Sequence, residues 1–213
     1  MRVSRLKLAM TLKLYGVEPS QPVRSVIWLL EINNIPYELV YCMPGHRKGT
    51  RSPDYIKKNP MAHVPFLEDE QSGVCLAEAA AIMVYLANKY KLHDLYPADL
   101  KSRALVDEYL HWHHRNTRCL TLAYFAPVVR GDLQLPAALV KSNAFSAKAA
   151  LKLLENRLAT QASASSCAVR RRSHLAFTIL LFVEIHGREQ CYNCGPLRVL
   201  RDWSMPPTVL RSH

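Results

Sequence analysis

Residues Thr11–Cys42, TLKLYGVEPSQPVRSVIWLLEINNIPYELVYC, decide the fold of the first part of the chain. Thr11–Tyr15 alternates apolar and polar side chains, which is typical of a strand. Val23–Asn33 carries apolar residues at helical spacing and stops at a pair of asparagines. Pro36–Cys42 is rich in β-forming residues and predicts a second strand. Such a β-α-β unit implies two parallel strands joined by a right-handed crossover.

The residues that follow extend this unit into a small mixed sheet. Their patterns predict a short helix at Pro53–Lys58, two short strands at Val64–Leu67 and Val74–Leu76, and an apolar helix at Glu78–Tyr90. Pro65 stands at the start of the first of these strands, and the acidic residues Glu68–Glu70 read as the turn after it. The resulting order, β-α-β-α-β-β-α, is thioredoxin-like.

From Lys101 onward the pattern is helical. Ser102–Leu122 and Leu139–Leu158 carry apolar residues at helical spacing, and no strand pattern interrupts them. The fold class is therefore α/β followed by all-α. We expect an N-terminal extension at residues 1–10, a thioredoxin-like domain at 11–92, a linker at 93–101, a helical domain at 102–160 and an atypical tail at 161–213.

The charge of the chain is strongly positive but dispersed. The formal net charge is +11, and the longest basic run is only Arg170–Arg172. A positive surface attracts anions such as phosphates, nucleic acid or small acidic ligands. Because the basic residues form no stripe, a generally basic surface is favoured over a nucleic-acid site.

The cysteines and the N-terminus bear on the compartment. Six cysteines occur without a secretory signal, since MRVSRLKLAM has no continuous apolar segment, so reduced thiols in the cytoplasm are expected. Residues 1–10 fit a weak organelle-targeting start or an extension ahead of a start at Met10. The longest apolar stretch, Leu175–Val183, is about half the ~20 residues of a membrane helix, so no membrane span is expected.

Ser20 is the first residue with candidate chemistry, because it stands between a strand and a helix start. One interpretation is an N-cap, in which the hydroxyl accepts from a helix N–H and Pro22 lies in the first turn. The other uses the same place differently. A hydroxyl at the positive end of a helix donates to a ligand thiolate, which the helix dipole also favours.

Three further features have a structural and a functional interpretation. Val64–Pro65 is either an ordinary strand-edge proline or a cis peptide whose neighbouring backbone pairs with an extended peptide ligand. Glu78 either complements a helix dipole in the first helical turn or meets a ligand that has both an amine and a carboxylate. The basic loop with Lys48 and Arg51 is either solvated or recognises a ligand carboxylate.

Two other constellations are rejected. His111, His113 and His114 have no clean i, i+4 pair and no carboxylate motif of a zinc hydrolase, so they read as a solvated or interhelical polar face. Cys191 and Cys194 form a lone CxxC, whereas a structural zinc site needs a second pair. No metal site is expected.

Taken together, four stretches in this order resemble the glutathione transferase family: SQPVR, NPMAHVP, LAEAAAIMVYL and LYPADLKSRALVDEYLHWHH. The theta class is the most similar, and the resemblance covers about residues 11–160. It implies a thioredoxin-like domain, an all-helical domain and usually a homodimer. It also implies glutathione as co-substrate, without a further cofactor, in a groove where the two domains meet.

The resemblance assigns roles to individual positions. Ser20 matches the hydroxyl that hydrogen-bonds the glutathione sulfur, and Val64 matches the residue whose backbone pairs with the cysteinyl group. Pro65 matches the cis-proline and Glu78 the acid beside the γ-glutamyl group. Arg118 falls where theta-type proteins place an arginine over the active site.

Three departures from the family pattern stand out. Ala79 replaces a serine, which removes a hydroxyl contact to the γ-glutamyl carboxylate. The basic loop differs in length, which leaves open whether Lys48 or Arg51 contacts the ligand. After Gln161 there is no Ser/Thr-x-x-Asp capping box, as a shifted reading frame or an unspliced segment would produce.

These observations leave three hypotheses. The first is a glutathione transferase that activates the thiol for attack on electrophiles or peroxides, as in detoxification. The second is a binding or assembly module with the same fold and impaired catalysis, which Ala79 and the tail favour. The third is a basic nucleic-acid binder, whose signature is a steep salt dependence.

Overall fold

The computed structural model describes residues 12–129 and 134–163 of the chain. The expectations for residues 1–10, for the tail after residue 163 and for the Cys191–Cys194 pair lie outside the described residues. The chain divides into two compact units between Leu86 and Ala87. Each unit is described by itself.

The first unit contains a four-stranded sheet with the order β2-β1-β3-β4. The parallel pair is β1 (Leu12–Gly16) and β2 (Glu38–Tyr41), joined through α1 (Gln21–Ile32). The strands β3 (Phe66–Asp69) and β4 (Val74–Ala77) form an antiparallel hairpin, and β3 is also antiparallel to β1. With α2 (Pro53–Lys58) and α3 (Ala79–Lys89), the order β-α-β-α-β-β-α is confirmed.

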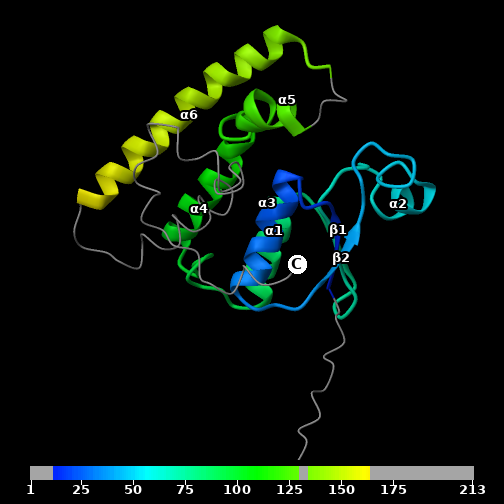
Figure 1. The fold of residues 1–213 in the computed structure, drawn as a ribbon. Helices are drawn as coiled ribbons and strands as arrows, with labels where there is room; N and C mark the ends of the chain where they lie inside the picture. The colour runs from blue at the N-terminus through cyan, green and yellow to red at the C-terminus, as the bar shows by residue number, and fades with distance from the viewer. Residues whose placement is uncertain (1–11, 130–133, 164–213) are drawn as a thin grey trace, which may run out of the picture. The chain divides into compact units, whose positions relative to one another are not determined.

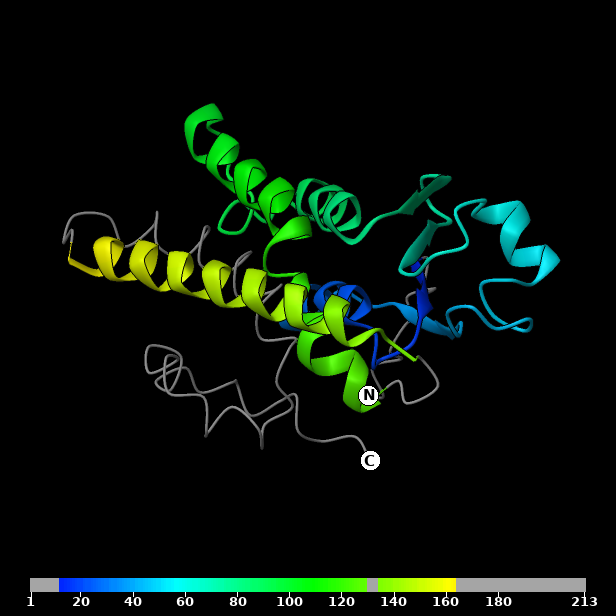
Figure 2. The ribbon, with the colours of Figure 1, turned by 90° about the horizontal axis from the view of Figure 1, so that it is seen from above.

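The helices cover both faces of this sheet, with α1 and α3 on one face and α2 on the other (Figure 1, Figure 2). Alternation along β1 sends Leu12 and Leu14 toward the α1 and α3 side, where both are fully buried beside Leu67 of β3. The helices contribute the other side of this core, namely Val26, Leu29, Leu30, Ile82, Met83 and Leu86.

A smaller aromatic cluster fills the opposite face of the sheet. Tyr15 of β1, Tyr55 of α2 and Phe66 of β3 pack with ring centroids 5.8–6.0 Å apart. Cys42 is buried in the same cluster, and the side chain of Val64 packs against it. Such aromatic contacts add about 0.5–1.5 kcal/mol per pair beyond area burial. The cluster therefore seats α2 on the sheet.

The structure corrects two expectations about element boundaries. Val64 and Pro65 precede β3 rather than begin it, because a proline has no N–H to give to the ladder. Glu68 and Asp69 belong to β3 itself and not to the turn.

Gly49 shapes the loop between β2 and α2. A Cβ at this position would overlap the carbonyl oxygen and the nitrogen of Met43. Both are main-chain atoms, which move less easily than the end of a flexible side chain. The Gly49 amide also donates to the His46 carbonyl at 2.9 Å. The close approach of two backbones thus requires a residue without a side chain.

We expect Gly49→Ala to lower the free energy of unfolding by about 2 kcal/mol, since overpacking of this kind costs roughly 1–3 kcal/mol. The measurement is the urea unfolding midpoint. Gly73→Asn is the control, because open space surrounds that position and asparagine tolerates its φ of +68°. Equal midpoints for wild type and Gly49→Ala would show that the loop relaxes freely.

The second unit contains α4 (Leu100–Trp112), which is capped by Asp99 accepting from the Ser102 amide at 2.9 Å. The expected continuous helix over Ser102–Leu122 is wrong, because α4 ends at Trp112. The Asn116 side-chain amide donates to the Trp112 carbonyl at 2.7 Å and so satisfies a free end of the helix.

Irregular helical turns follow before the long helix α6 (Ala137–Ser163). They are a 3-10 turn at His113–Arg115, a π-helical turn η2 (Thr121–Phe125) and α5 (Ala126–Val129). Figure 2 shows α6 as one long helix, which packs on η2. Within α6 the buried residues Ala147, Ala150 and Leu154 recur at helical spacing, which defines its packed face.

Of the two expectations for the histidines, a solvated or an interhelical polar face, the solvated face is wrong for His113, since only 3% of it is exposed. Its Nδ1 lies 2.6 Å from the Leu110 carbonyl, so Nδ1 carries the proton and donates. His111 and His114 are exposed, as expected. Burial lowers the pKa of His113 to about 4 despite the contact with Leu110, and nearby His114 and Arg118 lower it further.

Candidate functional site

The register of the sheet brings three candidate residues to one edge. Tyr15 at the end of β1 pairs with Phe66 at the start of β3, and Phe66 pairs with Ala77 at the end of β4. Ser20 follows β1, Val64 precedes β3 and Glu78 follows β4. Because paired residues lie about 5 Å apart across neighbouring strands, the segments that carry these residues meet the sheet side by side.

Ser20 occupies the N-cap position of α1, with φ −75° and ψ 119°. Its carbonyl accepts from the Val23 and Arg24 amides at 3.1 and 3.0 Å. Its side chain, however, makes no capping hydrogen bond. The capping interpretation therefore holds for the backbone and fails for the hydroxyl, which is left half-buried at the positive end of a 12-residue helix.

The Val64–Pro65 peptide bond is cis. Among the residues that the structure describes, neither the N–H nor the C=O of Val64 has a hydrogen-bond partner. The Val64 side chain packs against the aromatic cluster, and Pro65 is buried. The packed side chain thus holds the Val64 backbone in place, and this backbone offers one donor and one acceptor to an extended peptide ligand.

Glu78 directly precedes α3 instead of lying in its first turn. Its backbone is left-handed, with φ +68°, and its carbonyl accepts from the Ile82 amide at 2.9 Å. The left-handed region is uncommon for a residue with a Cβ and is often found at functional sites. The Glu78 side chain is exposed, whereas Ala79 is 7% exposed.

The basic loop leaves β2 at the same edge, because Tyr41 at the end of β2 pairs with Gly16 at the end of β1. Thr50 holds the loop together, since its hydroxyl accepts from the Gly45 amide at 2.9 Å and its own amide donates to the Met43 carbonyl at 3.1 Å. Lys48 and Arg51 are exposed on this loop.

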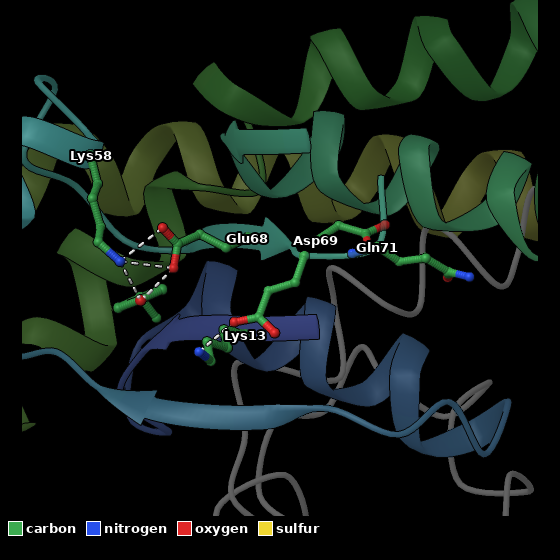
Figure 3. Close-up of polar contacts among 7 residues, drawn as sticks. Lys13, Lys58, Glu68, Asp69 and Gln71 are labelled. Atoms are coloured by element: carbon green, nitrogen blue, oxygen red, sulfur yellow. Dashed lines mark hydrogen bonds and ion pairs between the residues drawn. The ribbon is translucent and has the colours of Figure 1, made fainter. Parts of the chain in front are cut away.

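A polar network next to the aromatic cluster was not anticipated from the sequence. Lys58, at the end of α2, donates to the Tyr15 hydroxyl and to Glu68, each at 3.0 Å (Figure 3). Tyr15 also donates to Glu68 at 2.5 Å. Burial raises the pKa of Glu68, but the hydrogen bonds from Tyr15 and Lys58 outweigh it and the net pKa is lowered. The network ties the end of α2 to β1 and β3.

Three further contacts lie at the turn end of the hairpin formed by β3 and β4. Lys13 of β1 forms an ion pair with Glu70, with Nζ 2.5 Å from Oε1 (Figure 3). In the turn, the Asp69 carboxylate accepts from the Gln71 amide at 3.2 Å (Figure 3). Asp69 is buried and also accepts from the Tyr85 hydroxyl of α3 at 2.5 Å. These contacts hold the end of β3 and the hairpin turn against β1 and α3.

Arg118 belongs to the second unit, where it is half-buried and its amide donates to the His113 carbonyl at 3.0 Å. Within residues 12–129 and 134–163, no group of three His, Cys, Asp or Glu side chains is arranged to hold a metal ion. Cys42, Cys75 and Cys119 are free thiols. None of the helices in the described part of the chain is long and apolar enough to cross a membrane.

The edge can therefore hold an extended ligand with charges at its ends. Ser20 offers a hydroxyl at a helix N-terminus, Val64 a backbone donor and acceptor, and Glu78 a carboxylate for an amine. The basic loop offers cations for a carboxylate. No single one of these features is specific, but their order along the edge is that of a peptide lying across the sheet.

Comparison with known proteins agrees with this geometry. The family described as glutathione S-transferase, N-terminal domain, matches residues 14–94. A possible glutathione S-transferase from Rhodopseudomonas palustris is 32% identical, with a TM-score of 0.61 over 70% of this chain and 72% of that one. The chain belongs to the glutathione S-transferase family.

Within the family, the similarity is to the theta class. The mouse theta-1 enzyme is 37% identical over 155 residues, which are 70% of this chain and 62% of that protein. The apo form of human glutathione S-transferase T1-1 is 33% identical, with a TM-score of 0.58 over 68% of this chain and 62% of that one. This family member therefore matches less than two thirds of the length of its theta-1 relatives.

Proposed function

We propose that the chain is a glutathione transferase. It binds glutathione, stabilises the thiol as a thiolate, and directs that thiolate at an electrophilic carbon or a peroxide. The observation that carries the proposal is the hydroxyl of Ser20, which sits at a helix N-terminus without serving as its cap. A side chain in that position is available to donate to a bound sulfur.

The roles of the other residues follow from their places at the edge. The Val64 backbone pairs with the cysteinyl group of glutathione, and Pro65 is the cis-proline that follows Val64. Glu78 binds the γ-glutamyl amine. Ala79 follows it and has no hydroxyl to donate to the γ-glutamyl carboxylate. Lys48 or Arg51 receives the glycine carboxylate.

A thiolate is favoured at this position by two physical effects. A free cysteine thiol has a pKa of about 8.5, and only its thiolate is a strong nucleophile. A hydrogen bond donated to the sulfur and the positive end of α1 both stabilise the charged form, which lowers the thiol pKa. Holding the thiolate next to the electrophile then supplies proximity. Arg118 of the second unit stays a predicted contact to the same ligand.

The proposal extends to the partners of the chain. Glutathione is the co-substrate and no other cofactor or metal takes part in the reaction as proposed. We further propose that the chain is a cytoplasmic homodimer without a nucleic-acid or membrane partner. The free thiols support the reducing compartment, and the family resemblance supports the dimer.

A binding or assembly module is the second candidate, and Ala79 favours it. A lost contact to a buried carboxylate costs roughly 1–3 kcal/mol, which weakens glutathione binding by about 5- to 150-fold. Such a chain would still bind glutathione-like ligands at high concentration.

The experiment is conjugation of glutathione to a panel of small electrophiles by the purified chain, with glutathione binding measured in parallel by calorimetry. Conjugation above the uncatalysed rate, together with binding, supports the transferase. Binding without conjugation supports the binding module. A folded chain that neither binds nor conjugates glutathione contradicts both proposals.

A further inference from the structure

The carbonyl of His63 is held by two side chains of the first unit. The Tyr55 hydroxyl donates to it at 2.5 Å, and the Asn59 side-chain amide donates to it at 2.9 Å. Asn59 also donates to the Tyr55 hydroxyl at 3.4 Å. His63 itself is exposed, so these two buried donors converge on the main chain and not on a side chain.

The orientation of each donor is fixed by its own surroundings. Tyr55 is 5% exposed, and its ring is locked in the aromatic cluster. Asn59 is 2% exposed, and its Oδ1 accepts from the Met61 amide at 3.2 Å, which directs Nδ2 toward His63. Burial raises the pKa of Tyr55 to about 12, so the hydroxyl keeps the proton that it donates.

A held carbonyl determines the direction of the next amide. The His63 C=O and the Val64 N–H belong to one planar peptide group, and this peptide is trans. In a trans peptide the N–H points away from the C=O. Two hydrogen bonds on the carbonyl therefore fix the Val64 N–H on the opposite side, where no partner among the described residues meets it.

The same hydrogen bonds also change the strength of the donor. Hydrogen bonds in a chain polarise one another, by roughly 10–30% per bond. A peptide whose oxygen accepts twice has a more positive N–H, which donates better to a ligand carbonyl. Orientation and polarisation thus both favour binding at Val64.

We propose that Tyr55 and Asn59 are positioning residues for the peptide substrate, because they aim and polarise the Val64 N–H, which donates to the cysteinyl carbonyl of glutathione. This inference rests on the proposed function, since it names how one part of the proposed site is preorganised. Neither side chain touches the ligand. Their effect passes through the backbone of His63 and Val64.

Tyr55→Phe tests the proposal, because it removes the hydroxyl and keeps the ring in the cluster. We expect the KM for glutathione and the dissociation constant to rise about three- to tenfold, while kcat at saturating glutathione stays within about a factor of two. The 15N chemical shift of the Val64 amide in the ligand-free protein is expected to move as well. Tyr37→Phe is the matched control, since it removes a tyrosine hydroxyl that donates to Glu31 at 2.9 Å.

Each outcome decides between two statements. Wild type that binds glutathione, with equal affinity and an unmoved Val64 amide in Tyr55→Phe, overturns the positioning role and leaves the proposed function intact. Wild type that does not bind glutathione overturns both. If Tyr55→Phe does not fold, Asn59→Asp takes its place, because it keeps the acceptor for Met61 and replaces the donor to His63; the same affinity loss is expected.

Discussion

Ser20→Ala is expected to reduce kcat/KM for the electrophile, measured at saturating glutathione and pH 6.5, by roughly 10- to 150-fold. A hydrogen bond to a charged group is worth about 1.5–3 kcal/mol, and each 1.36 kcal/mol is a factor of ten in rate. Because the lost bond stabilises the thiolate and not the thiol, the pKa of bound glutathione should rise by about one to two units. Thiolate absorbance against pH, measured on the bound complex, reports that shift directly.

The activity lost in Ser20→Ala should depend on pH, because the substitution raises the pKa of the bound thiol. Raising the thiol pKa leaves less thiolate at low pH, so the gap between wild type and Ser20→Ala is largest there. Above the pKa of both complexes the thiol is ionised in each, and the gap should close. A gap that stays constant across pH would mean that Ser20 acts on something other than ionisation of the sulfur.

Stability separates this role from helix capping. An N-cap side chain contributes about 0.5–2 kcal/mol to folding. The Ser20 hydroxyl makes no capping hydrogen bond, so the unfolding midpoint of Ser20→Ala should match that of wild type. Ser20→Thr keeps a hydroxyl at the same position and is expected to restore most of the activity.

His113 is expected to make the folded state lose up to about 3 kcal/mol of stability between pH 7 and pH 4. The unfolded imidazole takes up a proton near its ordinary pKa of 6.5, whereas the folded one resists until about pH 4. Between these values the unfolded state binds more protons, so stability falls as pH falls. Below pH 4 both states are protonated at this residue, and the loss is complete.

His113→Asn is the variant that checks this expectation. The asparagine amide lies close to the former Nδ1 and donates to the Leu110 carbonyl, but it does not titrate. Urea midpoints of wild type and variant should converge as the pH is lowered from 7 to 4.5. The exposed His111→Asn is the control, and its pH dependence should follow wild type. Parallel curves for His113→Asn and wild type would rule out His113 as the origin of the loss.

The order of elements in the first unit was predictable because each segment has a strong local pattern. The apolar alternation of β1 and the helical spacing of α1 arise from residues close in sequence, and the structure confirms both. Ser20 was found in the same way, since it stands between a clear strand and a clear helix, and Val64 was found from the proline that follows it.

Contacts between distant segments were not predictable, because nothing local distinguishes the residues that make them. Lys58 and Glu68 look like surface charges in the sequence, and only the packing of α2 on the sheet brings them together. Asn59 follows the expected helix Pro53–Lys58 without any distinguishing pattern, whereas in the structure it is buried and donates to the His63 carbonyl. The left-handed backbone of Glu78 likewise depends on how β4 connects to α3, and no residue pattern in the sequence predicts it.

The central position of β1 has a consequence for synthesis of the chain. Leu14 pairs with Leu39 on one side and with Leu67 on the other, and the second partner is translated long after the first. Until β3 has left the ribosome, the side of β1 that pairs with β3 has no partner for its amides and carbonyls. The nascent chain therefore exposes a template for wrong pairing during this interval, and a fragment that stops after β2 should require a chaperone to remain in solution.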